Sequence, residues 1–90
     1  MLCLLFETGE LRCAIPCARI EEVLPLTLLE PVPGTGDALA GLLPFRSGML
    51  PVLDAGLLLS GVPSPRKLST RLVVLAGAQR LALICAGAHD

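Results

Sequence analysis

Three short turn segments, each lying between two apolar runs, constrain this 90-residue chain more than any other feature. The turns are Thr-Gly-Glu at 8–10, Arg-Ser-Gly at 46–48 and Gly-Ala-Gln at 77–79. After the first turn, Leu11, Cys13 and Ile15 alternate with other residues, which is the period-2 pattern of a half-buried strand. Each turn with its flanks predicts a β-hairpin. Three hairpins with little helix predict an all-β fold, a small barrel or sandwich.

Between the first two hairpins the spacing of apolar residues changes. Ile20, Val23 and Leu24 recur at i, i+3 and i+4, and Pro25 follows, so residues 18–24 are predicted to form one or two turns of amphipathic helix. The proline-rich residues 26–33 favour an extended edge or connecting segment, and residues 34–37 a loop. Asp54 is suited to cap a short helical turn through residues 57–59, and residues 60–70 form a solvated loop.

The composition is unusually apolar for a chain of this length. Hydrophobic residues make up 53% and the mean hydropathy is +0.75. A domain this small exposes much of its surface, so the chain either enters a membrane or buries apolar surface against another protein. No run approaches the ~20 apolar residues that span a bilayer, and residues 1–6 have no basic leader. We therefore expect a cytoplasmic chain with an apolar face and a tendency to form a homo-oligomer.

The charge and the cysteine content limit which partners, compartments and metals the chain is expected to have. The net charge is −1 with two Phe and no Trp or Tyr, which argues against nucleic acid. Four cysteines without a secretory signal favour a reduced compartment. Only Cys13 and Cys17 are close in sequence, and their spacing does not match the usual zinc pair, so the cysteines are expected to act as small core hydrophobes. Neither a metal nor a cofactor is expected.

The candidates for catalysis are few. The single histidine, His89, lies one residue from the end, and adjacent carboxylates such as Glu21 and Glu22 do not face each other on a helix. The chain is therefore expected not to be an enzyme. Arg46, in an apolar turn, and Glu22, among apolar residues, stand out as charges. They are either ordinary solvated charges or charges that pair with each other, or with a partner, to fix a binding surface.

In order and spacing, the segments resemble the CheW-like domains of chemotaxis adaptors. The first hairpin, Ala-Ile-Pro at 14–16 and Ile-Glu-Glu-Val-Leu at 20–24 are similar to the start of such domains. A proline-rich segment at 30–34, Gly-Leu-Leu-Pro-Phe-Arg-Ser-Gly at 41–48 and Pro-Val-Leu-Asp at 51–54 follow. The last hairpin, residues 71–76 and 81–87, is similar to the family's next two strands. The series as a whole carries the resemblance.

The resemblance implies one domain over residues 1–90, with two small five-stranded β-barrels sharing a hydrophobic interface. It implies a non-catalytic scaffold that couples a CheA-type histidine kinase to a methyl-accepting chemoreceptor, recruited through its partners to membrane receptor arrays. Matched by position, Arg46 is the family's motif arginine and Glu22 its glutamate, and with Ile20 these residues are expected to contact the receptor.

Two departures from the family pattern have structural consequences. The glycine expected directly after the arginine is Ser47, so a positive φ there would strain the turn. Family members also continue beyond the position of Asp90, which predicts an incomplete barrel. The alternative function is a self-assembly module completed by strand exchange with a second copy, without kinase or receptor binding.

Overall fold

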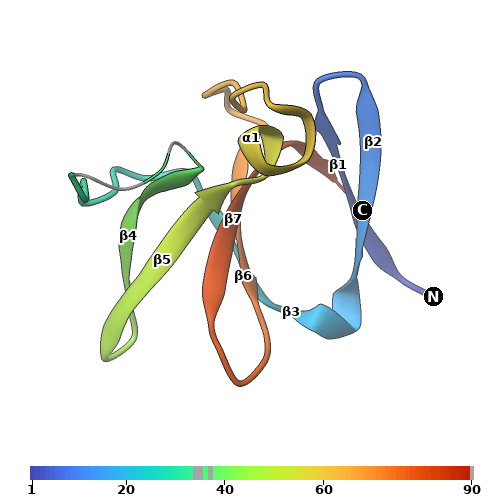
Figure 1. The fold of residues 1–90 in the computed structure, drawn as a ribbon. Helices are drawn as coiled ribbons and strands as arrows, with labels where there is room; N and C mark the ends of the chain where they lie inside the picture. Colours follow the sequence, from blue (N-terminus) through green and yellow to red (C-terminus); the bar gives the residue numbers. More distant parts are fainter. Residues whose placement is uncertain (34–35, 37, 90) are drawn as a thin grey trace.

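The computed structural model describes residues 1–33, 36 and 38–89, and strands dominate them (Figure 1). The predicted loop at 34–37 falls mainly on residues 34, 35 and 37, which lie outside this description. The predicted all-β class is confirmed, as are the three hairpins, which are β1–β2, β4–β5 and β6–β7. The elements are β1 (Cys3–Thr8), β2 (Leu11–Pro16), η1 (Cys17–Arg19), β3 (Ile20–Pro25), β4 (Leu39–Phe45), β5 (Gly48–Asp54), α1 (Ala55–Ser60), β6 (Arg71–Leu75) and β7 (Leu81–His89).

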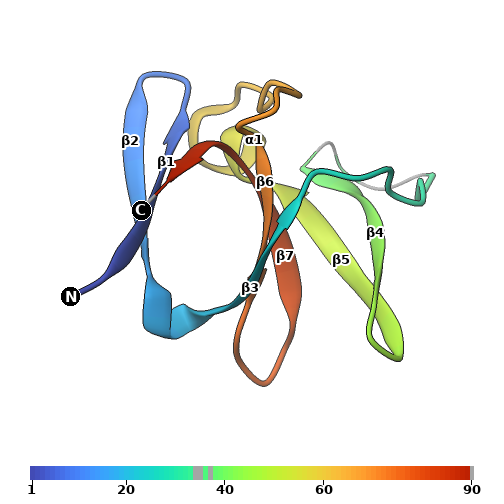
Figure 2. The ribbon, with the colours of Figure 1, turned by 180° about the vertical axis from the view of Figure 1, so that it is seen from behind.

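Strand β7 is the centre of the sheet. It pairs antiparallel with β6, parallel with β5, and through its C-terminal end antiparallel with β1. The order is β2-β1-β7-β5-β4, and β3 joins through β6. The sheet therefore divides into two curved lobes that share β3, β6 and β7. The first lobe adds β1 and β2, which together with the shared strands outline the ring seen in Figures 1 and 2, and the second lobe adds β4 and β5.

The shared strands have apolar side chains on both faces. In β6, Leu72 and Val74 belong to the core of the second lobe, whereas Val73 belongs to the core of the first. All three are fully buried, as expected for a strand covered on both sides. The continuous apolar run Leu-Val-Val-Leu at 72–75 is thus explained by a position between two cores. The shared hydrophobic interface that the family resemblance implies is present.

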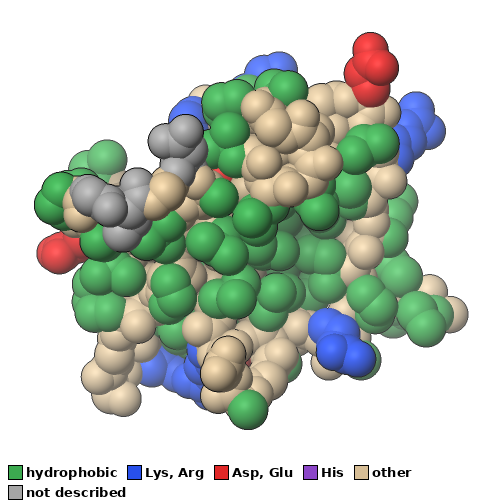
Figure 3. All heavy atoms as spheres, in the orientation of Figure 1, with side chains coloured by type: hydrophobic (Ala, Val, Ile, Leu, Met, Phe, Trp, Pro, Cys, Tyr) green, Lys and Arg blue, Asp and Glu red, His purple; other side chains and the backbone are tan. Residues whose placement is uncertain are grey.

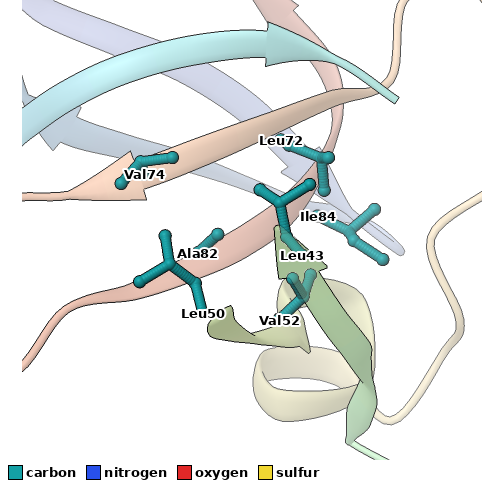
Figure 4. Packing of buried hydrophobic residues seen from close by; sticks show 7 residues of the cluster. All are labelled: Leu43, Leu50, Val52, Leu72, Val74, Ala82 and Ile84. Carbon is teal, nitrogen blue, oxygen red and sulfur yellow. The ribbon is translucent and has the colours of Figure 1, made fainter. Parts of the chain in front are cut away.

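The core of the second lobe is built from four strands. Its buried side chains converge from β4, β5, β6 and β7 in Figure 4, and they are Leu43, Leu50, Val52, Leu72, Val74, Ala82 and Ile84. Five of these are fully buried, namely Val52, Leu72, Val74, Ala82 and Ile84. Burying such aliphatic side chains contributes ~1.5–3 kcal/mol each relative to leaving them exposed.

The second lobe is closed at its far edge by one bridge to the connecting segment. Glu30 and Leu42 exchange two backbone hydrogen bonds, each 2.9 Å long. The neighbouring Gly41 has φ +152°, and a Cβ there would lie 2.6 Å from the carbonyl oxygen of Glu30. Only glycine fits this approach. Residues 26–33 thus serve as the predicted connecting segment and close the lobe.

The predicted helix at residues 18–24 is wrong. The chain forms only the short 3₁₀ turn η1 and then enters strand β3 at Ile20. A β-bulge shifts the register between Ile20 and Glu22, so Glu21 is an extra residue opposite β6. Because of the extra residue, Ile20 and Val23 lie on the same face of β3 although they are three residues apart. A spacing of three is also typical of one face of a helix, so the sequence pattern was misleading.

The predicted cap at Asp54 is confirmed. Its buried carboxylate accepts hydrogen bonds from the backbone N–H groups of Gly56 (2.9 Å) and Leu57 (3.4 Å) at the start of α1. The Ser64 hydroxyl donates to the same carboxylate at 2.7 Å, and the Arg66 guanidinium lies 3.6 Å away. Asp54 therefore ties the end of β5 to α1 and to the loop that follows.

Candidate partner-binding surface

The turn between β4 and β5 presents Arg46. The two-residue loop is Arg46-Ser47, and Arg46 has φ 55°, a left-handed conformation. A positive φ at the first loop residue is the pattern of type II′ hairpin turns, where glycine is usual. The positive φ thus falls on Arg46 and not on Ser47, so the serine causes no strain of the predicted kind. The guanidinium carbon lies 4.9 Å from the centroid of the Phe45 ring.

The predicted pair of Arg46 and Glu22 is present, although Glu22 is the more distant of two acidic neighbours. Nη2 of Arg46 lies 3.8 Å from Oε1 of Glu22, whereas its Nε lies 3.2 Å from Oε2 of Glu21. On the helix predicted for residues 18–24, Glu21 and Glu22 would not face each other. The β-bulge in β3 instead directs both carboxylates towards Arg46, because bulges turn neighbouring side chains to one side.

Arg80 is a fourth member of this charged group, and it was not expected from the sequence. Its Nε lies 3.0 Å from Oε1 of Glu21. Arg80 directly precedes β7, in the turn of the third hairpin, just as Arg46 lies in the turn of the second. In Figure 3, basic side chains lie between the ends of these two hairpins. The similar turn positions were the only sequence signal, and proximity of the turns required the fold.

Ile20 does not join the charged group. It packs against the core of the first lobe, and it lines a groove of about 380 Å³ together with Leu4, Val23 and Ala88. Val23 lies opposite Val73 in the strand pairing, so it also faces the first lobe. The three predicted site residues therefore occupy two surfaces. Arg46 and Glu22 lie on the charged surface, and Ile20 lies in the groove of the first lobe.

Exposed apolar side chains are numerous, as the composition predicts. Figure 3 shows hydrophobic atoms across the middle of one face, over β5, β7 and the first lobe. Large hydrophobic residues that are at least two fifths exposed are Met1, Leu2, Leu5, Leu11, Val23, Leu28, Met49, Leu58, Leu59, Val62 and Leu68. A continuous apolar patch such as the one in Figure 3 is typical of a protein interaction surface.

The cysteines differ from one another. Cys85 is buried in the core of the first lobe, as predicted, and burial raises the pKa of its thiol from 9.0 to about 12, with Cys13 and Asp54 contributing. The expectation of four core cysteines is wrong for Cys17, which is exposed at the start of η1. Within the described residues, no three potential metal ligands lie together. None of the described helices is long and apolar enough to cross a membrane.

Comparison with known proteins gives three findings. The CheW-like domain family matches residues 2–90. Protein FrzA of Myxococcus xanthus is 41% identical over 49 residues, or 54% of this chain and 31% of that protein. The crystal structure of the scaffolding protein TtCheW from Thermoanaerobacter tengcongensis matches with a TM-score of 0.86 at 18% identity, over 98% of this chain and 61% of that one. The chain thus spans less than two thirds of either protein.

Proposed function

The chain belongs to the CheW-like domain family, and from this premise we propose that residues 1–90 form an adaptor that couples a CheA-type histidine kinase to a chemoreceptor. CheW-like domains are non-catalytic scaffolds, in agreement with the prediction that this chain is not an enzyme. The proposed place of action is the cytoplasmic side of a receptor array, reached through the partners. The similarity to the scaffolding protein TtCheW favours this adaptor over an independent self-assembly module.

The proposed contact with the receptor is based on the charged group formed by Arg46, Glu21 and Glu22. Arg46 is held by Glu21 at 3.2 Å and stacks on Phe45, yet its side chain is 57% exposed. A guanidinium that is oriented on one side and accessible on the other is suited to contact a protein partner. We assign the receptor contact to this surface, with Arg46 and Glu22 as its charged residues.

A charge reversal tests the receptor contact. Arg46→Glu places a third carboxylate beside Glu21 and Glu22, and we expect receptor binding to weaken about tenfold, because like charges oppose docking. Adding Glu22→Arg restores part of the affinity. Glu22 is the better site for the second change because Glu21 also binds Arg80. The measurement is titration calorimetry with the cytoplasmic tip of the cognate chemoreceptor.

Equal affinities of the wild type and Arg46→Glu would show that Arg46 and Glu22 are ordinary surface charges without a role in receptor binding. Loss of the cooperative thermal transition in Arg46→Glu would assign the pair a structural role instead. A control variant, Arg12→Glu, reverses a charge on exposed β2, away from this group, and is expected to bind as the wild type does.

The kinase arm of the proposal rests on the first lobe. Its interior residues Cys13, Ile15, Ile20, Leu75 and Leu83 are only partly buried, and Val23 at the groove is 42% exposed. Covering such apolar surface stabilises a complex by about 25 cal/mol per Å² before the costs of association. We propose that the regulatory domain of the kinase covers this lobe.

A matched pair of substitutions tests the kinase arm. Val23→Asp places a charge in a groove that Arg71 also lines, and it is expected to weaken kinase binding several-fold, because burying a charge costs free energy that one exposed ion pair does not offset. Leu68→Asp introduces the same charge at a loop residue that is 96% exposed, and it should leave binding unchanged. A pull-down with the isolated regulatory domain gives both values. Equal retention of the two variants would remove the first lobe from the interface.

Self-association remains a prediction. The outer edge of β2 has no strand partner among the described residues, because β2 pairs only with β1. Such an edge offers unpaired backbone donors and acceptors to a second copy. Light scattering over a concentration series is expected to show a dimer, whereas the mass of one chain at every concentration would contradict this.

A further inference from the structure

Two hairpin turns converge on one carboxylate. Arg46, from the β4–β5 turn, and Arg80, from the β6–β7 turn, bind different oxygens of Glu21, at 3.2 and 3.0 Å. The side chain of Glu21 is 18% exposed, whereas those of Arg46 and Arg80 are 57% and 47% exposed. Two accessible cations are therefore held side by side by a more shielded anion.

Both arginines use the same nitrogen for this internal contact. Each approaches Glu21 through Nε, so the outer Nη groups are not needed to hold the guanidinium in place. Nη2 of Arg46 lies 3.8 Å from Glu22, which is beyond an ordinary hydrogen bond. The planar fork of a guanidinium matches a carboxylate, and it can bind one carboxylate on each edge. The Nη groups of both side chains thus remain available for an incoming carboxylate.

We propose that Arg46 and Arg80 together bind one carboxylate side chain of the protein partner, and that Glu21 is the positioning residue that sets the distance between them. The inference rests on the proposed receptor contact and deepens it by naming Arg80, Glu21 and the acidic chemistry of the partner. Arg46 and Arg80 balance the charges of Glu21 and Glu22. Loss of Arg80 leaves a local excess of negative charge, which repels an acidic partner.

A purely structural role for Arg80 makes a different prediction. In that case the Arg80–Glu21 contact would only fasten the β6–β7 turn to β3. Exposed ion pairs contribute little to folding stability, so removing Arg80 would then change neither the melting temperature nor binding appreciably. A binding role leaves the melting temperature unchanged and lowers affinity, so the two measurements together separate the roles.

The experiment uses two probes and four variants. The probes are the cytoplasmic tip of the cognate chemoreceptor and the same tip with its acidic residues changed to the corresponding amides. Titration calorimetry compares the wild type with Arg80→Gln, Arg80→Lys, Glu21→Gln and the control Arg12→Gln. For the acidic tip, Arg80→Gln is expected to bind about 3- to 5-fold more weakly, in the range of exposed charge pairs. The affinity of Arg80→Lys should lie between those of the wild type and Arg80→Gln, because lysine keeps the positive charge but lacks the planar guanidinium.

The amide tip supplies the decisive comparison. It should bind the wild type and Arg80→Gln equally, since the carboxylate that Arg80 recognises is gone. In Glu21→Gln, the Nε–H proton of Arg46, which donates to Glu21, should exchange faster with water in NMR spectra, because a neutral amide holds a guanidinium less strongly than a carboxylate does. The control Arg12→Gln should bind both tips as the wild type does.

The outcomes separate this inference from the receptor contact on which it rests. Unchanged binding of the acidic tip by Arg80→Gln, with the wild type binding, overturns the inference alone. An equal loss for the acidic and amide tips also overturns it, because the partner carboxylate would then have no part in the effect. Failure of the wild type to bind the acidic tip overturns the receptor contact and this inference with it.

Discussion

The two lobes differ in how completely they enclose their cores. In the second lobe, the bridge between Glu30 and Leu42 closes the far edge, and buried side chains such as Val52 and Leu72 are fully shielded. In the first lobe, β2 and β3 are joined by η1 without pairing to each other, and the interior side chains of Ile15 and Ile20 remain partly exposed. The shared strands β3, β6 and β7 serve both lobes.

This difference separates stability from binding within one small domain. Fully enclosed apolar side chains contribute most to folding, because their transfer from water is complete. Partly enclosed side chains contribute less to folding and retain surface that a partner can cover. The second-lobe core has seven buried side chains and the first-lobe core has five, so we expect the second lobe to contribute more to stability and the first to offer more apolar surface to a partner.

A pair of leucine truncations on the shared strands tests this comparison with the largest expected effect. Leu72→Ala, on the second-lobe face of β6, should lower the free energy of unfolding by about 3–5 kcal/mol, because it opens a cavity in a closed core. Leu83→Ala, on the first-lobe face of β7, should cost about 1–2 kcal/mol, since water already reaches that side chain. Urea denaturation gives both values. Equal losses would mean that the first lobe is as closed as the second.

The closure of the second lobe can be disturbed by one methyl group. In Gly41→Ala the new Cβ would meet the Glu30 carbonyl oxygen at 2.6 Å, and φ +152° is unfavourable for alanine. We expect a loss of about 2 kcal/mol in the free energy of unfolding. Gly48→Ala is the control, because a Cβ there meets no atom within 4 Å. Gly41→Ala with the stability of Gly48→Ala would show that the Glu30–Leu42 bridge does not close the lobe.

Thiol reactivity provides a smaller but site-specific test of the first lobe. Exposed Cys17 should react with a maleimide in the folded protein, whereas Cys85 should react only as fast as the chain unfolds. The raised pKa keeps the Cys85 thiol neutral in the folded state, whereas the thiol of the unfolded chain ionises near pH 9. The free energy of unfolding is therefore unaffected by this group below pH 9 and falls as the pH rises from 9 towards 12. In Cys85→Ala this alkaline loss should shrink. Rapid labelling of Cys85 at pH 7 would show that the first-lobe core opens readily.

The sequence was sufficient where the structural signal was local. The three hairpins follow from turn residues between apolar runs, and the Asp54 cap follows from a residue type that suits a helix start. The predicted helix at residues 18–24 failed because a bulge gives Ile20 and Val23 the spacing of a helix. Arg80 was not expected from the sequence, and Glu21 was considered only as a catalytic carboxylate, because their contact depends on the packing of the β6–β7 turn beside β3, which is distant in sequence.

Hydrogen exchange of the backbone amides, with and without the kinase regulatory domain, tests the division of roles most directly. In the free chain, amides of β5 and β6 should exchange most slowly, and those of β2 and β3 faster. On binding, β2 and β3 should gain protection, while β4 and β5, which belong only to the second lobe, change little. Uniform exchange in the free chain, or new protection confined to β4 and β5, would contradict the account.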